Sequence, residues 1–142
     1  MNIYTAKVSS TINAPAAKVW SALIDPAMIK QYLFGTEAVS DWKEGSSITY
    51  KGVWEGKPYE DKGNIIKMIP EKLLVTTYWS GFSGLVDLPE NYNTVTYELM
   101  AGDDSTTLTI SQDNIATQEA QEHSEKNWTM VMDGLKKVVE GK

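Results

Sequence analysis

Residues 118–140 read QEAQEHSEKNWTMVMDGLKKVVE and form the longest segment of the chain with a helical period. Thr117 can cap the start of this segment, and Glu119 lies near the positive end of the helix dipole. Apolar residues recur along one stripe, and charged residues occupy the opposite stripe. The apolar stripe consists of Trp128, Val131, Met132, Leu135, Val138 and Val139. The pattern therefore predicts one long amphipathic helix that packs against another element through this stripe.

Upstream of this helix the period of the pattern changes to two, which is typical of half-buried strands. β-Branched and aromatic residues alternate in six segments, which are 37–41, 46–54, 59–69, 72–80, 92–100 and 105–112. Turn residues separate the segments, and the longest connection is the loop 80–91. Because no helical segment lies between them, we expect successive strands to be antiparallel neighbours.

The first part of the chain predicts one strand followed by two short helices. Residues 2–12 alternate as a strand does, and Asn13 offers an N-cap side chain just before Pro15. A helical face follows over residues 16–24. Asp25 and the proline after it end that helix and can cap a second one, which reaches residue 33.

The order of these elements predicts an α+β fold. It contains a curved antiparallel sheet of about seven strands around a long C-terminal helix, with the two short helices after the first strand. A long, twisted sheet curls, and a helix in its concave face leaves part of the groove open. We therefore expect an elongated cavity between helix and sheet. No repeat, linker or low-complexity segment interrupts the pattern, which indicates one domain over residues 1–142.

Composition excludes several classes of function. The chain has 142 residues and a net charge of −6, and its thirteen cationic side chains are all lysines. Arginine normally supplies the bidentate contacts to phosphates and guanines, so we expect neither nucleic acid nor an anionic membrane as a partner. Without cysteine, disulfides and the common structural zinc sites are excluded. No apolar run is long enough for a membrane span and no signal pattern is present, so the simplest location is the cytoplasm.

The chain resembles the family named after the activator of the Hsp90 ATPase, within the Bet v 1-like or START-like (SRPBCC) helix-grip superfamily. The likeness runs in order through nearly the whole sequence. Its carriers are residues 12–20 (INAPAAKVW), Leu23-Ile24-Asp25-Pro26, Gly63-Asn64-Ile65, residues 69–74 (IPEKLL), Thr77-Tyr78-Trp79, residues 93–99 (NTVTYEL), residues 106–110 (TTLTI), Asn127-Trp128 and Leu135-Lys136. The resemblance implies the helix-grip fold.

The resemblance does not extend to one activity, because the family carries no shared catalytic signature. The co-chaperone that gives the family its name uses a separate N-terminal domain for much of its Hsp90 binding. Nothing in these 142 residues corresponds to that domain. We therefore do not expect Hsp90 activation from the resemblance alone.

Ionisable residues suggest no catalytic or metal site and no cofactor. His123 is the single histidine and lies on a polar part of the predicted helix, so we interpret it as a solvated surface residue. Glu60 and Asp61 are adjacent in a predicted strand, where side chains alternate between faces, so they cannot act on one substrate as paired carboxylates. We interpret them as part of an exposed hairpin strand.

Large aromatic and methionine side chains at inward-facing positions give the strongest functional signal. Such residues are usually core, but they can also line a partly open apolar pocket with a few polar groups. The favoured hypothesis is a binding module for a small, largely apolar molecule between the C-terminal helix and the sheet. Its candidate ligand-binding residues are Trp54, Met68, Trp79, Tyr97, Trp128 and Met132.

Two other functions remain open. In the first, the loop 80–91 binds a protein partner, as a co-chaperone would. Its apolar residues Phe82, Leu85, Val86 and Leu88 would form the contact patch. The second is an enzyme of the cyclase or dehydratase type, which the superfamily includes. Tyr97 is then the best candidate for a polar group in the pocket, although the sequence indicates no base beside it.

Overall fold

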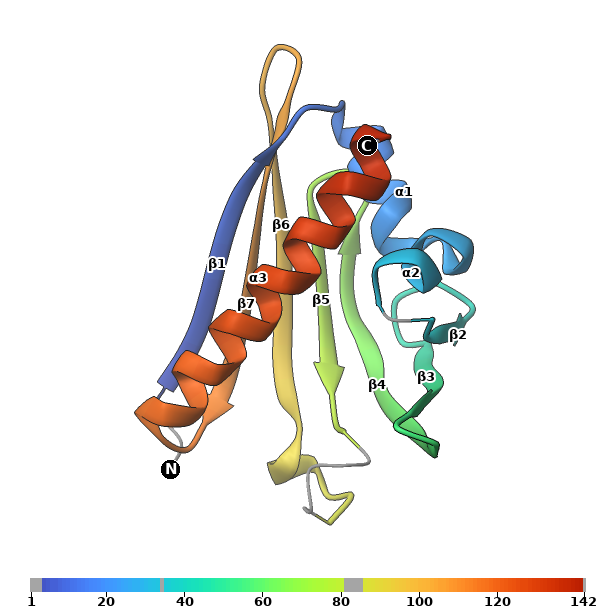
Figure 1. The fold of residues 1–142 in the computed structure, drawn as a ribbon, viewed down its shortest axis with the longest axis vertical. Coiled ribbons are helices and arrows are strands. Elements are labelled where there is room, and N and C mark those ends of the chain that lie inside the picture. The colour runs from blue at the N-terminus through green and yellow to red at the C-terminus, as the bar shows by residue number, and fades with distance from the viewer. Residues whose placement is uncertain (1–3, 34, 81–85, 142) are drawn as a thin grey trace.

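A seven-stranded antiparallel sheet curves around one long helix in the computed structural model, which describes residues 4–33, 35–80 and 86–141 (Figure 1). The side chain of Trp54 is outside this description. The strands are β1 (Tyr4–Ile12), β2 (Glu37–Ser40), β3 (Ser47–Trp54), β4 (Lys57–Ile69), β5 (Leu73–Tyr78), β6 (Asn93–Ala101) and β7 (Thr106–Ile115). The helices are α1 (Ala16–Ile24), α2 (Pro26–Tyr32) and α3 (Gln118–Glu140), with a 3-10 turn η1 (Pro89–Asn91).

The strands follow the order β1-β7-β6-β5-β4-β3-β2 across the sheet. From β2 to β7, strands that are consecutive in sequence are therefore neighbours in the sheet, as the alternating pattern predicts. The first strand, β1, pairs with the last, β7, in antiparallel register from Tyr4 opposite Ile115 to Ile12 opposite Thr106. The predicted α+β architecture is confirmed.

The long strand β4 pairs with different strands along its two halves. Its first half pairs with β3, and its second half pairs with β5. Near the crossover the backbone of β5 comes so close to Gly63 that an added Cβ would lie 1.7 Å from the carbonyl oxygen of Thr77. Only glycine fits there, because any side chain would collide with the neighbouring backbone.

Of the two short helices, α2 has the predicted N-cap and α1 does not. Asp25 caps α2 as predicted, and its side chain accepts a hydrogen bond from the N–H of Ala27 at 2.9 Å. The prediction that Asn13 caps α1 is wrong, because Pro15 occupies the N-cap position. The backbone N–H of Asn13 instead donates to the carboxylate of Glu140 at 2.8 Å and so links the start of α1 to the end of α3.

The C-terminal helix begins and ends where its sequence predicts. Thr117 caps it by accepting from the N–H of Ala120 at 3.1 Å, and Gly141 ends it in the left-handed conformation. Its apolar stripe contacts β1, β7, α1 and α2. The helix crosses the face of the sheet diagonally, from the side of β1 to that of α1 and α2 (Figure 1). Its fully buried part is Val131, Met132, Leu135 and Val139, while Trp128 and Val138 are half-buried.

Candidate functional site

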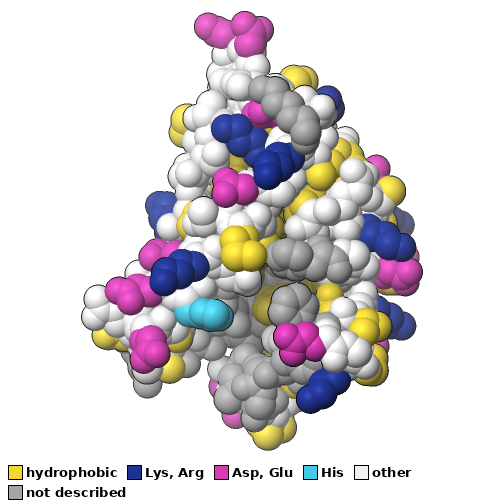
Figure 2. Space-filling view, viewed as in Figure 1, with side chains coloured by type: hydrophobic (Ala, Val, Ile, Leu, Met, Phe, Trp, Pro, Cys, Tyr) yellow, Lys and Arg dark blue, Asp and Glu magenta, His cyan; other side chains and the backbone are white. Residues whose placement is uncertain are grey.

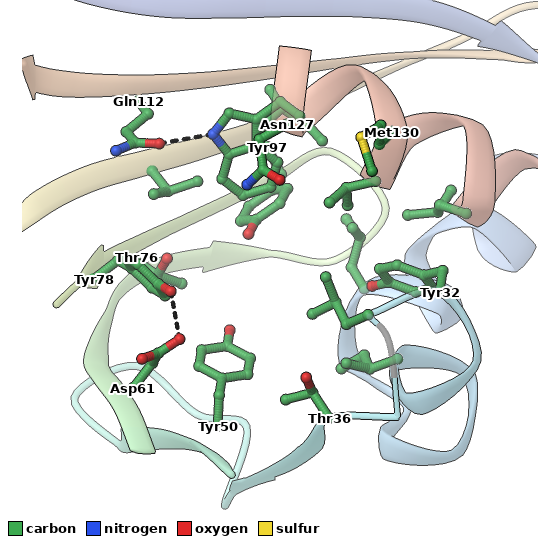
Figure 3. A pocket seen from close by; sticks show the side chains of 18 of the residues that line it. Tyr32, Thr36, Tyr50, Asp61, Thr76, Tyr78, Tyr97, Gln112, Asn127 and Met130 are labelled. Atoms are coloured by element: carbon green, nitrogen blue, oxygen red, sulfur yellow. Dashed lines mark hydrogen bonds between the residues drawn. The ribbon is translucent and has the colours of Figure 1, made fainter. Parts of the chain in front are cut away.

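A cavity of about 450 Å³ lies between α3 and the sheet, and it is lined by side chains from all three helices and from β3 to β7 (Figure 3). This volume falls in the range of small-molecule sites. Figure 2 shows the molecule hollowed beside α3, with apolar side chains inside the hollow. The space expected from the topology is therefore present in the structure.

Most of the cavity wall is apolar. Aliphatic side chains come from the helices and the central strands, and several of them are fully buried. They are Leu23, Ile29, Leu33, Val53, Leu74, Val95, Ile110, Val131 and Leu135, with Met130 in addition. An organic molecule in contact with this wall would be held mainly by the removal of apolar surface from water.

One end of the cavity is polar and centres on the carboxylate of Asp61. Asp61 on β4 is only 9% exposed, and the hydroxyl of Tyr78 on β5 donates to its Oδ2 at 2.6 Å. The ring of Tyr50 on β3 lies next to that of Tyr78, with centroids 6.2 Å apart. Figure 3 shows these three side chains grouped on one side of the cavity. A ligand polar group that reached this end would meet one carboxylate and two phenols.

Four tyrosines around the cavity have raised pKa values and stay protonated well above neutral pH. Burial raises the pKa of Tyr50 to about 12, and the negative charge of Asp61 adds to the rise. Burial also raises the pKa of Tyr78, where the charge of Asp61 and the hydrogen bond to it act in the same direction. Burial likewise raises the pKa of Tyr32 and of Tyr97. The hydroxyl groups of these four tyrosines are therefore neutral, and those of Tyr32 and Tyr78 already donate to the carbonyl of Ala22 and to Asp61.

A second set of contacts fixes the wall between the helix and the last strands. The indole N–H of Trp128 on α3 donates to Gln112 on β7 at 2.7 Å. The ring of Tyr97 on β6 meets the same indole edge-on, with centroids 6.1 Å apart and an angle of 83°. Among the exposed α3 residues, Asn127 and Met130 line the cavity. Helix and sheet are thus joined here by a specific polar contact as well as by packing.

Of the six candidate ligand-binding residues, the structure brings Tyr97 and Trp128 to the cavity. Met132 is 3% exposed and belongs to the core, and Met68 packs against that core. Neither lines the cavity, and neither does Trp79, whose ring lies 5.6 Å from the ammonium of Lys62. The side chain of Trp54 is outside the described residues. A ligand-binding role for the six stays a prediction.

Several residues of the polar end were missed in the sequence, and Asp61 is the most important. The interpretation of Asp61 as part of an exposed strand is wrong, whereas its neighbour Glu60 is exposed as expected. Asp61 shares its parity along β4 with the buried residues Gly63 and Ile65. That alternation was the available signal. In the same way, Tyr78 shares its parity along β5 with buried Leu74 and Thr76.

The remaining candidate residues lie on the surface or outside the description. His123 is exposed on α3, where the single histidine appears in cyan in Figure 2. The described residues contain no group of three or more His, Asp or Glu side chains able to hold a metal ion. In the loop 80–91, Val86 and Leu88 are 66% and 43% exposed, while Phe82 and Leu85 lie outside the described residues. None of the helices, as far as the chain is described, is long and apolar enough to cross a membrane.

Comparison with known proteins gives one family and a group of similar folds. Residues 13–140 match the family described as Activator of Hsp90 ATPase homolog 1-like protein. The solution structure of ChR145 from Cytophaga hutchinsonii is 48% identical in sequence, with a TM-score of 0.86 over 99% of this chain and 97% of that one. No curated protein sequence matches the chain.

Two more distant structures share the fold. The solution structure of the Aha1 dimer from Colwellia psychrerythraea is 18% identical, with a TM-score of 0.76 over 97% of each chain. The crystal structure of CalU16 from Micromonospora echinospora is 20% identical, with a TM-score of 0.75 over 95% of this chain and 75% of that one. At these identities the likeness concerns the fold alone.

Proposed function

The chain belongs to the family of Activator of Hsp90 ATPase homolog 1-like proteins, and we propose that it is a binding module for a small, largely apolar molecule held between α3 and the sheet. One observation carries the proposal, namely the cavity of about 450 Å³, whose wall is mostly apolar and whose polar groups include the buried Asp61. Such a combination of apolar walls and few polar groups is typical of small-molecule sites. The helix-grip fold commonly serves this purpose, which agrees with the proposal. A cytoplasmic location stays a prediction.

Filling the cavity tests the proposal directly. Val95 lies on the cavity wall and is 1% exposed, whereas Val39 on β2 is 57% exposed and does not line the cavity. We expect the neutral fluorescent probe N-phenylnaphthylamine to bind the wild-type protein at micromolar concentration, about 8 kcal/mol of standard free energy. Val95→Trp should weaken this binding at least tenfold, which is about 1.4 kcal/mol, and Val39→Trp should leave it unchanged.

The outcome of this test is clear if both variants stay folded, which thermal unfolding can verify. Equal binding to Val95→Trp and Val39→Trp would place the probe elsewhere and count against the proposal. Native mass spectrometry of protein purified from its own host gives a second readout. A small molecule retained by the wild-type protein and lost from Val95→Trp would support the same site.

A second candidate function has support from the Asp61–Tyr78 pair. The sequence indicates no base beside a pocket tyrosine, but the hydroxyl of Tyr78 donates to the carboxylate of Asp61 at 2.6 Å. In an enzyme of the cyclase or dehydratase type, Asp61 would accept a proton from a bound substrate while the phenols donate hydrogen bonds. A retained molecule that accumulates chemically changed in wild-type protein and unchanged in Asp61→Asn would favour this function over simple binding.

The observations support a protein-interaction function less strongly than ligand binding. Val86 and Leu88 are exposed as a contact patch requires, but two isolated apolar side chains are normal on a protein surface. The role of the loop 80–91 in partner binding therefore stays a prediction.

A further inference from the structure

Several tyrosines line the cavity, and their hydroxyl groups differ in whether the protein itself already binds them. Tyr32 donates to a backbone carbonyl oxygen of α1 at 2.7 Å, and Tyr78 donates to Asp61 at 2.6 Å. The hydroxyl of Tyr59 shares a hydrogen bond with that of Thr36. These three phenols are therefore part of the internal hydrogen bonding of the protein.

Two further tyrosines of the wall, Tyr50 on β3 and Tyr97 on β6, differ from these three. Within the described part of the chain, neither hydroxyl forms a hydrogen bond with a side chain or with the backbone. Figure 3 shows both hydroxyl groups pointing into the cavity, one from each side of it. Since β4 and β5 lie between these two strands in the sheet, the two hydroxyl groups reach the same cavity from separate parts of its wall.

Neighbouring rings hold both tyrosines in position. The ring of Tyr50 lies beside that of Tyr78, with centroids 6.2 Å apart, and the ring of Tyr97 meets Trp128 edge-on at 6.1 Å. Aromatic pairs at such distances attract each other, and both tyrosines also pack against the hydrophobic core. Their hydroxyl groups are therefore ordered before a ligand enters, which lowers the entropic cost of using them in binding.

Both hydroxyl groups carry their protons at neutral pH and can act as hydrogen-bond donors. Burial raises the pKa of Tyr50 to about 12 and raises the pKa of Tyr97 well above its ordinary value. A purely apolar ligand that displaced water from these groups would leave two O–H donors without an acceptor, which is unfavourable. An accepting oxygen on the ligand removes this penalty.

We infer that Tyr50 and Tyr97 determine ligand specificity by donating hydrogen bonds to carbonyl oxygens of the bound molecule. The cavity then selects ketones with an apolar body over hydrocarbons of the same shape, because a site built to form a hydrogen bond rejects an analogue that lacks the group. This inference rests on the proposed binding function and adds the class of ligand and the two residues that recognise it.

Three molecules with one skeleton test the inference in the full-length protein. Bibenzyl, deoxybenzoin and benzil each contain two phenyl rings on a two-carbon link, and they carry no, one and two carbonyl oxygens. Equilibrium dialysis at neutral pH measures their dissociation constants. We expect the dissociation constant to fall about threefold with each carbonyl, as a net hydrogen bond implies. A wall without donors gives the opposite order, because each carbonyl group loses hydration on entering it.

Phenylalanine variants remove the two hydroxyl groups and keep the rings. In the double variant Tyr50→Phe/Tyr97→Phe we expect the order to reverse, so that bibenzyl binds most tightly. Each single variant should lose part of the preference for benzil. Tyr92→Phe is the matched control, because its hydroxyl donates to Asp87 and does not line the cavity. It should keep the wild-type order.

Thermal unfolding shows whether the variants are folded. Because neither hydroxyl bonds to another described residue, we expect the unfolding midpoints of the single and double variants to stay close to that of the wild type. If the double variant does not fold, the two single variants provide the test. An unchanged preference for benzil in both of them would then overturn the inference.

The outcomes separate this inference from the proposed function. If bibenzyl binds the wild-type protein most tightly, or if the order persists in the double variant, the cavity is a binding site and the inference is wrong. If none of the three molecules binds, the inference is also wrong. Binding of N-phenylnaphthylamine to the wild type and its loss in Val95→Trp then decide the proposed function independently.

Discussion

The indole of Trp128 on α3 donates a hydrogen bond to the side-chain oxygen of Gln112 on β7, with 2.7 Å between Nε1 and Oε1. The same indole meets the ring of Tyr97 edge-on at 6.1 Å between centroids. All three side chains line the cavity. One tryptophan therefore both fastens the helix to the sheet and forms part of the candidate binding site.

Trp128→Ala should destabilise the protein by about 2–4 kcal/mol, because it removes a large apolar side chain and one hydrogen bond. The lower part of the usual range for aromatic truncations applies, since Trp128 is only half-buried. Urea unfolding followed by circular dichroism measures the change. Lys126→Ala, at an exposed position of the same helix, should change stability by less than about 0.5 kcal/mol. Similar losses in both variants would mean that the buried stripe of α3 is assigned incorrectly.

The fold could be predicted from the sequence because its signals are local and repeated. The apolar stripe of α3 and the alternation of the strands each extend over many residues, and a wrong period would conflict with the turn residues between segments. The cap at Asn13 failed for a different reason. Its backbone N–H bonds to Glu140, which is 127 positions away in sequence, and no local pattern encodes that contact.

The candidate site was harder to predict because burial alone does not separate a cavity wall from a packed core. Met132 and Tyr97 both carry the inward-facing signal, yet Met132 fills the core and only Tyr97 lines the cavity. For Asp61 the sequence predicts an exposed hairpin strand, because adjacent strand residues such as Glu60 and Asp61 point to opposite faces and cannot act as a pair. Its burial depends on Tyr78 from the neighbouring strand, and only the strand register brings these two residues together.

Tyr78→Phe should destabilise the protein by about 1.5–3 kcal/mol, because it removes a hydrogen bond to a buried charged group. Tyr92→Phe is the matched control, since the hydroxyl of Tyr92 also donates to a carboxylate, that of exposed Asp87. We expect a clearly smaller effect from Tyr92→Phe, because water can replace an exposed hydrogen bond. Chemical denaturation of both variants provides the comparison. Equal effects would argue against a special role of the pair inside the cavity.

Stability should fall at alkaline pH because burial raises the pKa values of the cavity tyrosines. Unfolded tyrosines lose protons near pH 10.0, whereas Tyr50 keeps its proton up to about pH 12. The folded protein then binds more protons than the unfolded chain. The stabilisation is complete below pH 10.0 and is lost as pH rises, by about 1.4 kcal/mol per pH unit for each such tyrosine.

Urea unfolding at about pH 8 and about pH 11 measures this loss, and phenolate absorbance follows the titration itself. Tyr50→Phe should make the decline shallower, because one group with a raised pKa is removed. If the absorbance of the folded protein showed all tyrosines titrating together near pH 10.0, their burial in the cavity would be contradicted.

Gly63→Ala should destabilise the protein by more than about 3 kcal/mol, because the new Cβ would lie 1.7 Å from the carbonyl oxygen of Thr77 and the strands would have to separate. The same shift would displace Asp61 and Tyr78, so ligand binding should weaken as well. Gly102→Ala is the control, since the nearest atom to its added Cβ is the hydroxyl oxygen of Ser105 at 3.3 Å. It should cost less than about 1 kcal/mol. Thermal unfolding measures the difference between the two variants. Equal unfolding midpoints for Gly63→Ala and Gly102→Ala would contradict the close approach of β4 and β5.

Tryptophan emission should report occupancy of the cavity through Trp128 rather than through Trp79. Trp128 lines the cavity, whereas Trp79 lies beside Lys62 and is not part of the described lining. A brominated alkanol quenches an indole only by contact and carries no charge, so it should enter the cavity and quench the wild-type protein. Trp79→Phe should keep most of this quenching, and Trp128→Phe should lose most of it. Titration of the quencher against the three proteins measures the difference. If quenching survived in Trp128→Phe and disappeared in Trp79→Phe, the ligand would bind next to the loop 80–91, and the site between α3 and the sheet would have to be abandoned.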